Sequence, residues 1–211
     1  MIKIPQDLVQ IFNSDNVEDL KKIWPLLTRP QRRKGVFTEA VCRDGCPNIL
    51  AYCAAYADNR IKFDALMGCV KRKRGDLCNL IAPHCRPLDV RKALGHSLAL
   101  HHSEVAHILS QHNTESLNGE EIKEVIRSFS TLSYQKVEEY FEILLRHTPQ
   151  EIMNNVLENY VLFPFFFKSD RDQANGLKEK SDMFYSKNAL QQALKAIPKQ
   201  DLCPGVKKRK M

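Results

Sequence analysis

Apolar residues recur at every third or fourth position along most of the chain, and alternating runs of β-branched residues are absent. A spacing of three to four places apolar side chains on one face of a helix, whereas strict alternation indicates a strand. The sequence therefore predicts an all-α fold.

One apolar stripe is found four times along the chain. Its first position is Leu20, and it returns after 43, 42 and 32 further residues. The four stripes are Leu20, Ile23, Trp24 and Leu27; Phe63, Leu66, Met67 and Val70; Val105, Ile108, Leu109 and His112; and Val137, Tyr140, Phe141 and Leu144. We interpret this recurrence as a structural repeat in which each unit carries one striped helix.

Shorter apolar segments precede the striped helices, and prolines stand where leading helices are expected to begin, at Pro5, Pro47, Pro87 and Pro149. The first turn of a helix tolerates proline because its N–H groups have no partner within the helix. The predicted unit is therefore a helix pair, and stacked pairs bury apolar faces that a single pair leaves exposed. We expect an α-solenoid of stacked helix pairs, with an irregular helical bundle as the alternative.

Three segments resemble the ankyrin repeat. Residues 16–23 (Asn-Val-Glu-Asp-Leu-Lys-Lys-Ile) and 102–109 (His-Ser-Glu-Val-Ala-His-Ile-Leu) are similar to its outer helix, and residues 44–50 (Asp-Gly-Cys-Pro-Asn-Ile-Leu) are similar to its opening. The resemblance implies an ankyrin-like solenoid and a protein-binding function. Because the spacings of 43 and 42 residues exceed the family's roughly 33, it also implies long connections between helices.

The pattern divides the chain into three parts. Residues 1–148 form the predicted ankyrin-like array. Residues 149–200 predict C-terminal capping helices, since an array needs an atypical end unit to cover its last apolar face. Residues 201–211 are expected to form a flexible basic tail.

The net charge of +7 is concentrated in clusters rather than spread over the chain. The first basic cluster is Arg29, Arg32, Arg33 and Lys34, and the second basic cluster is Lys71, Arg72, Lys73 and Arg74. Each begins about a dozen residues after the start of a striped helix, so we expect both in equivalent connections on one edge of the stack. Together they predict a binding surface for an acidic protein partner.

Nucleic acid is the alternative partner, because clustered cations also contact phosphates. Both clusters are almost free of the aromatic residues on which bases stack, which makes this alternative weaker.

A third cluster, Lys207, Lys208, Arg209 and Lys210, is similar to a nuclear import signal. The chain has seven cysteines, an odd number that favours a reducing compartment, and neither a secretory signal nor an apolar run long enough to span a membrane. We expect a cytoplasmic location, with the nucleus or delivery into a host cell as alternatives.

No linear motif of a hydrolase, nucleotide-binding or deaminase site is present. His102, Glu104 and His107 lack the spacing of a zinc protease, and Cys42 with Cys46 is the one cysteine pair spaced like zinc ligands, with Cys78, His84 and Cys85 as its remaining candidates. We therefore expect no metal, no cofactor and no enzymatic activity. The predicted function is a non-catalytic interaction scaffold, and small degenerate ankyrin-like proteins of this kind resemble the effectors that intracellular bacteria deliver into host cells.

Overall fold

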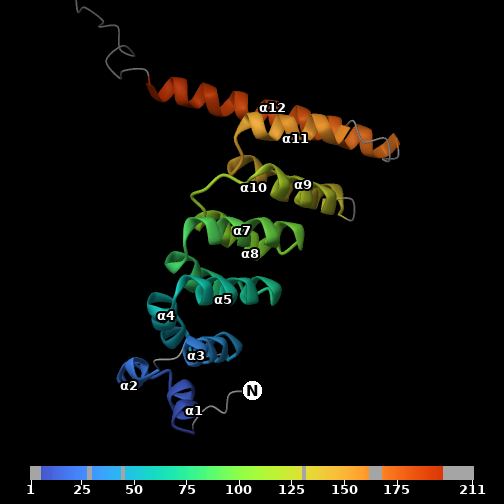
Figure 1. The fold of residues 1–211 in the computed structure, drawn as a ribbon. Helices are drawn as coiled ribbons and strands as arrows, with labels where there is room; N and C mark the ends of the chain where they lie inside the picture. Colours follow the sequence, from blue (N-terminus) through green and yellow to red (C-terminus); the bar gives the residue numbers. More distant parts are fainter. Residues whose placement is uncertain (1–5, 28–29, 44–45, 130–131, 162–167, 197–211) are drawn as a thin grey trace, which may run out of the picture. The chain divides into compact units, whose positions relative to one another are not determined.

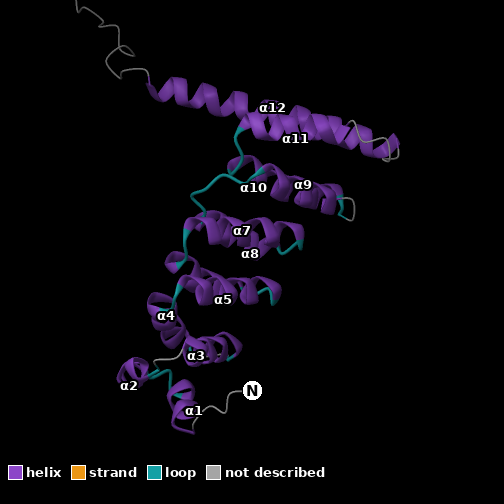
Figure 2. Cartoon of the chain, viewed as in Figure 1, coloured by secondary structure: helices purple, strands orange, loops and turns teal. Residues whose placement is uncertain are grey.

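The computed structural model describes residues 6–27, 30–43, 46–129, 132–161 and 168–196, and every regular element among them is a helix (Figure 2). The all-α prediction is thus confirmed. The α-helices, all but α6 labelled in Figure 1, are α1 (Gln6–Asn13), α2 (Val17–Ile23), α3 (Pro30–Cys42), α4 (Pro47–Tyr56), α5 (Asn59–Lys71), α6 (Gly75–Ile81), α7 (Pro87–Ala99), α8 (Ser103–His112), α9 (Gly119–Ser128), α10 (Tyr134–Arg146), α11 (Gln150–Val161) and α12 (Lys168–Ala196). Two short 3-10 helices, η1 (Trp24–Leu26) and η2 (Ala82–His84), continue α2 and α6.

The chain divides into two compact units, Met1–Thr148 and Pro149–Met211. In the second unit α11 packs along α12, and the Lys178 ammonium lies 3.7 Å from the Glu158 carboxylate. The capping role of these helices stays a prediction. The expected flexible tail at 201–211 lies outside the described residues.

The helices of the first unit pack in two rows. Successive odd-numbered helices from α3 to α9 contact one another, and so do successive even-numbered helices from α2 to α10. Each of the first four odd-numbered helices also contacts the even-numbered helix that follows it. We call these the odd row and the even row. Fully buried side chains come from both, among them Phe37, Leu50, Leu66, Ile81 and Leu94, so the core lies between the rows.

The spacing of the helices differs from the spacing read in the sequence. Helices of the even row begin at Val17, Pro47, Gly75, Ser103 and Tyr134, at intervals of 30, 28, 28 and 31 residues. The sequence spacings of 43 and 42 are each about one and a half of these intervals. The stripes taken as equivalent therefore lie on α2 and α8 of the even row but on α5 of the odd row. The predicted repeat length is therefore wrong.

The residues expected to form long connections are helices instead. Helices α3 and α6 occupy them, and both gave a weak pattern: α3 opens with basic residues, and α6 has only seven residues. A stripe alone does not identify the row, because a helix of either row buries one face.

Three odd-numbered helices end in the same turn. Asp15, Lys73 and His101 follow α1, α5 and α7 with φ angles of 47°, 58° and 59°, the left-handed conformation that glycine usually adopts there. The N–H of each next residue donates to the carbonyl five residues earlier in the chain, as from Arg74 to Cys69 at 3.0 Å. Asn16 and His102 make the equivalent bonds to Ile11 and Ser97 at 3.1 and 3.0 Å. This Schellman turn reverses the chain from the odd row into the even row.

Asp15 also joins one helix pair to the next. Its carboxylate accepts hydrogen bonds from the backbone N–H groups of Asn48 at 3.1 Å and Ile49 at 2.9 Å. These groups lie in the first turn of α4, whose own N-cap residue, Cys46, makes no side-chain cap. Asp15 therefore caps a helix of the neighbouring pair and complements its dipole.

Replacing Lys73 by glycine is expected to raise the free energy of unfolding by about 1 kcal/mol, because glycine adopts a positive φ without steric cost. Asp15→Gly relieves the same backbone strain but removes the cap on α4, a loss of about 1 kcal/mol, so we expect it to leave the free energy of unfolding nearly unchanged. Urea denaturation followed by circular dichroism measures both. An equal effect of the two substitutions would contradict the assigned role of Asp15.

Candidate partner-binding site

The structure places the two basic clusters in different kinds of connection. The first cluster leads from the even row into α3, whereas the second leads from α5 into the even row. The prediction that they occupy equivalent connections on one edge is therefore wrong, and the cause is the half-unit error in the repeat. Arg29 lies outside the described residues, and of Arg32 only the helical backbone is described.

Side chains of the first cluster are engaged within the chain. The Arg33 guanidinium lies 5.6 Å from the centre of the Trp24 ring, and its Nε donates to the Leu27 carbonyl at 2.8 Å. Lys34 forms an ion pair with Asp64 of α5 at 2.5 Å. These contacts hold the start of α3 against η1 and α5, so neither charge is free for a partner.

Arg74, the last residue of the second cluster, is also paired. Its guanidinium donates to both carboxylate oxygens of Asp76, at 2.7 and 3.0 Å, and these bonds lower the pKa of that carboxyl below its usual value. The pair spans the N-terminus of α6, where a negative charge complements the helix dipole. Arg74 therefore stabilises the turn itself.

The remaining cations of the second cluster, Lys71, Arg72 and Lys73, are exposed. Within the described residues their side chains form no ion pair. Their backbone is fixed all the same, since the N–H groups of Arg72 and Lys73 bond to the carbonyls of Cys69 and Val70 at 3.2 and 3.1 Å. The turn thus presents three exposed cations from an ordered backbone.

A groove of about 530 Å³ lies between α3 and α5, beside these cations. Its apolar lining includes Phe37 and Val41 of α3 and Phe63 and Met67 of α5. The Lys34–Asp64 ion pair lines it as well, and so do Lys71 and Arg72. Three of the basic residues named from the sequence therefore line one groove: Lys71 and Arg72 from the second cluster and Lys34 from the first.

Gly68 of α5 also lines this groove, and beyond the adjoining residues and backbone of α5 no atom lies within 4 Å of where its Cβ would be. The sequence reasoning missed both the groove and this residue. A lone glycine within an apolar helical pattern was the available signal, because such a residue often marks a close approach or a functional gap.

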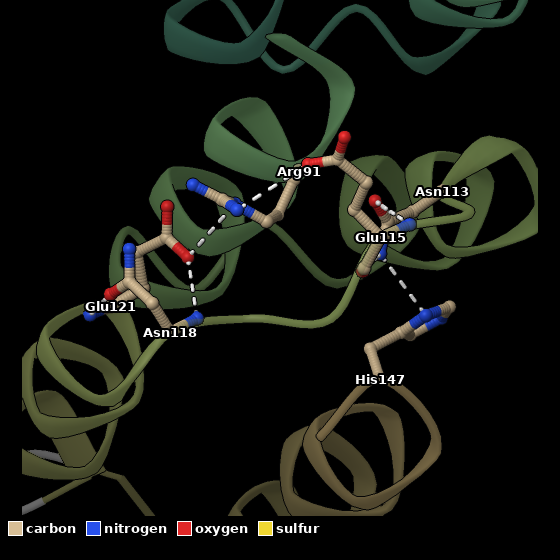
Figure 3. Close-up of polar contacts among 6 residues, drawn as sticks. All are labelled: Arg91, Asn113, Glu115, Asn118, Glu121 and His147. Carbon is tan, nitrogen blue, oxygen red and sulfur yellow. Dashed lines mark hydrogen bonds and ion pairs between the residues drawn. The ribbon is translucent and has the colours of Figure 1, made fainter. Parts of the chain in front are cut away.

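A second polar cluster surrounds the connection between α8 and α9 (Figure 3). Arg91 of α7 reaches the carboxylates of Glu115 and Glu121, at 3.3 and 3.4 Å. Glu121 forms a capping box with Asn118, in which each side chain accepts from the other's backbone N–H at 2.9 Å. Arg91 therefore ties this connection and the start of α9 to α7.

His147 joins the same connection to the end of α10. The amide of Asn113 is oriented by Glu115, because its NH₂ group donates to the Glu115 carbonyl at 2.6 Å. The same NH₂ group donates to Nδ1 of His147 at 3.1 Å, so Nδ1 carries no proton (Figure 3). The protonated Nε2 donates to the Ser110 hydroxyl at 2.7 Å.

This arrangement resembles a serine–histidine pair, but its hydrogen bond runs the wrong way for catalysis. A general base must accept the serine proton, whereas His147 donates to Ser110. Burial, followed by the charge of Arg146, lowers the pKa of His147 below its ordinary value. The neutral ring thus acts as a structural bridge.

The residues considered as zinc ligands are not brought together. Within the described residues no group of three or more histidine, cysteine or acidic side chains could hold a metal ion. Burial raises the pKa of the Cys85 thiol to about 12 and also raises that of Cys53. The pKa of the Cys78 thiol is raised too, chiefly through its hydrogen bond with Cys69. These thiols are therefore protonated at neutral pH and pack as small apolar groups.

Comparison with protein-family models, with curated protein sequences and with solved structures finds no match to this chain. In the part of the chain that the structure describes, no helix has the length and apolar character needed to cross a membrane.

Stability should depend on the protonation of His147. Because its pKa is lower in the folded state, the unfolded chain binds the proton more readily, so stability is full above about pH 6.5 and falls as the pH drops below it. The slope contributed by one proton is at most about 1.4 kcal/mol per pH unit. We expect the His147→Gln variant to lose this contribution when unfolding by urea is compared at pH 7.5 and 5.5. Equal pH dependence in the two proteins would show that His147 does not titrate in this way.

Proposed function

We propose that the first unit is an α-solenoid scaffold that binds an acidic protein partner and has no catalytic function. The observation that carries the proposal is the ordered turn after α5, where the exposed side chains of Lys71, Arg72 and Lys73 lie beside an apolar groove. Clustered cations on a fixed backbone attract acidic surfaces and accelerate association.

The packing in two rows supports a scaffold. Helix pairs that contact their neighbours in both rows present a continuous surface of successive helices, which is how solenoid proteins bind their partners. Intervals of 28 to 31 residues between even-row helices agree with a repeated unit of one helix pair.

The ankyrin resemblance is not part of this proposal. The segments similar to the outer helix begin α2 and α8, and the segment similar to the opening leads into α4. All three helices belong to the even row, whereas the resemblance would place the opening and the outer helix on successive helices of one unit. We therefore propose a solenoid of helix pairs without assigning it to that family.

Reversing the three exposed charges tests the proposal. We expect the variant Lys71→Glu/Arg72→Glu/Lys73→Glu to lose the protein that wild type captures from cell extract. With that protein purified, its affinity should fall at least tenfold at 0.15 M salt, and less at 0.5 M because salt screens the attraction. Isothermal titration calorimetry measures both.

The matched control is Arg60→Glu/Lys92→Glu/Lys136→Glu, which changes the net charge equally at exposed positions of the first unit. It should bind like wild type. The proposal fails if both triple variants retain the same partners. It also fails if wild type captures no protein but binds generic duplex DNA with steep salt dependence, the result expected of nucleic-acid binding.

A further inference from the structure

The groove between α3 and α5 is elongated along the helices. Its lining on α5 runs from Ile61 to Lys71, a length of about 15 Å at 1.5 Å per residue. An extended peptide covers that length with about five residues. The groove therefore has the proportions of a site for a short segment of chain.

The middle of the groove has room for one bulky apolar side chain. Beyond the adjoining residues and backbone of α5 itself, no atom lies within 4 Å of the Cβ position of Gly68, and half-buried Met67 and Phe63 lie on the same helix. Phe37 and Val41 of α3 are almost fully buried and form the opposite wall. Burying a Leu or Phe side chain in such a place strengthens binding because its apolar surface is removed from water.

The groove carries its free charge in one region. Lys34 and Asp64 neutralise each other. Lys71 lies seven residues beyond Asp64, about 10 Å along α5, and neither it nor Arg72 forms an ion pair among the described residues. A ligand that fits this pattern is apolar where it meets Gly68 and negatively charged where it meets Lys71 and Arg72.

We propose that this groove binds a short acidic peptide segment of the partner protein, with one bulky apolar residue seated over Gly68 and its neighbouring Asp or Glu residues paired with Lys71 and Arg72. The inference rests on the proposed function and specifies its ligand. The apolar lining favours a peptide over a nucleic acid strand. The cations available within the groove to the phosphates of such a strand would be Lys71 and Arg72.

Filling the groove tests this inference. Gly68→Leu places a side chain in the open space, while Gly68→Ala improves helix propensity and leaves most of the space empty. Thr38→Trp, at an exposed position of the opposite wall, is a second blocking variant. Circular dichroism and thermal unfolding of the full-length chain establish that each variant folds.

The probe is a random 12-residue peptide display library selected on the wild-type chain. We expect enriched peptides to share one Leu, Ile, Met, Phe or Trp next to two or more acidic residues. Synthesised peptides should bind Gly68→Ala like wild type and bind Gly68→Leu and Thr38→Trp at least tenfold more weakly. Chemical shift changes in the wild-type chain should centre on α3 and α5.

Several results would overturn the inference: no enrichment, enriched peptides without acidic residues, shift changes centred on other helices, or unchanged affinity in both blocking variants. Its failure is distinct from failure of the proposed function. If charge reversal abolishes binding of the partner protein while the two blocking variants retain it, the scaffold and its basic turn stand and the groove is not the site. If charge reversal also has no effect, both proposals fail.

Discussion

The helices of the first unit are 7 to 13 residues long, and isolated helices of this length are at best marginally stable in water because few hydrogen bonds offset the cost of nucleation. Their stability therefore comes from burying one face against neighbours in the same row and against the opposite row. The turns must reverse the chain sharply to allow this contact. Schellman turns at Asp15, Lys73 and His101 do so, and each accepts a strained backbone that tertiary packing holds in place.

The same constraint produces the candidate site. The turn after α5 must present its side chains outward, so Lys71, Arg72 and Lys73 are exposed on a backbone that the reversal itself fixes. The groove beside them lies where the packing of α3 on α5 is incomplete at Gly68. The ion pair of Lys34 and Asp64 holds the two helices together across it. The candidate site thus combines an ordered backbone in the turn with incomplete side-chain packing in the groove beside it.

At the connection between α8 and α9, polar contacts supplement helix packing. Arg91 links α7 to two glutamates, and His147 links the end of α10 to Ser110 and Asn113 (Figure 3). The Leu117 N–H also donates to the His147 carbonyl at 2.7 Å. Partly buried groups of this kind need their partners to offset the loss of water, which makes this part of the unit sensitive to the protonation of one imidazole.

The sequence by itself determined the helical class, because apolar spacing follows directly from helix geometry and needs no knowledge of the neighbours. It also identified the second basic cluster, a local run of charges. The spacing of the stripes assigned the helix of Phe63 to the wrong row, since helices of either row bury one face and look alike in sequence. Only the tertiary structure decided the row of each helix, the pairing of Lys34 with Asp64 and the open space at Gly68, because contacts between residues about 30 positions apart depend on how helices stack and leave no local pattern.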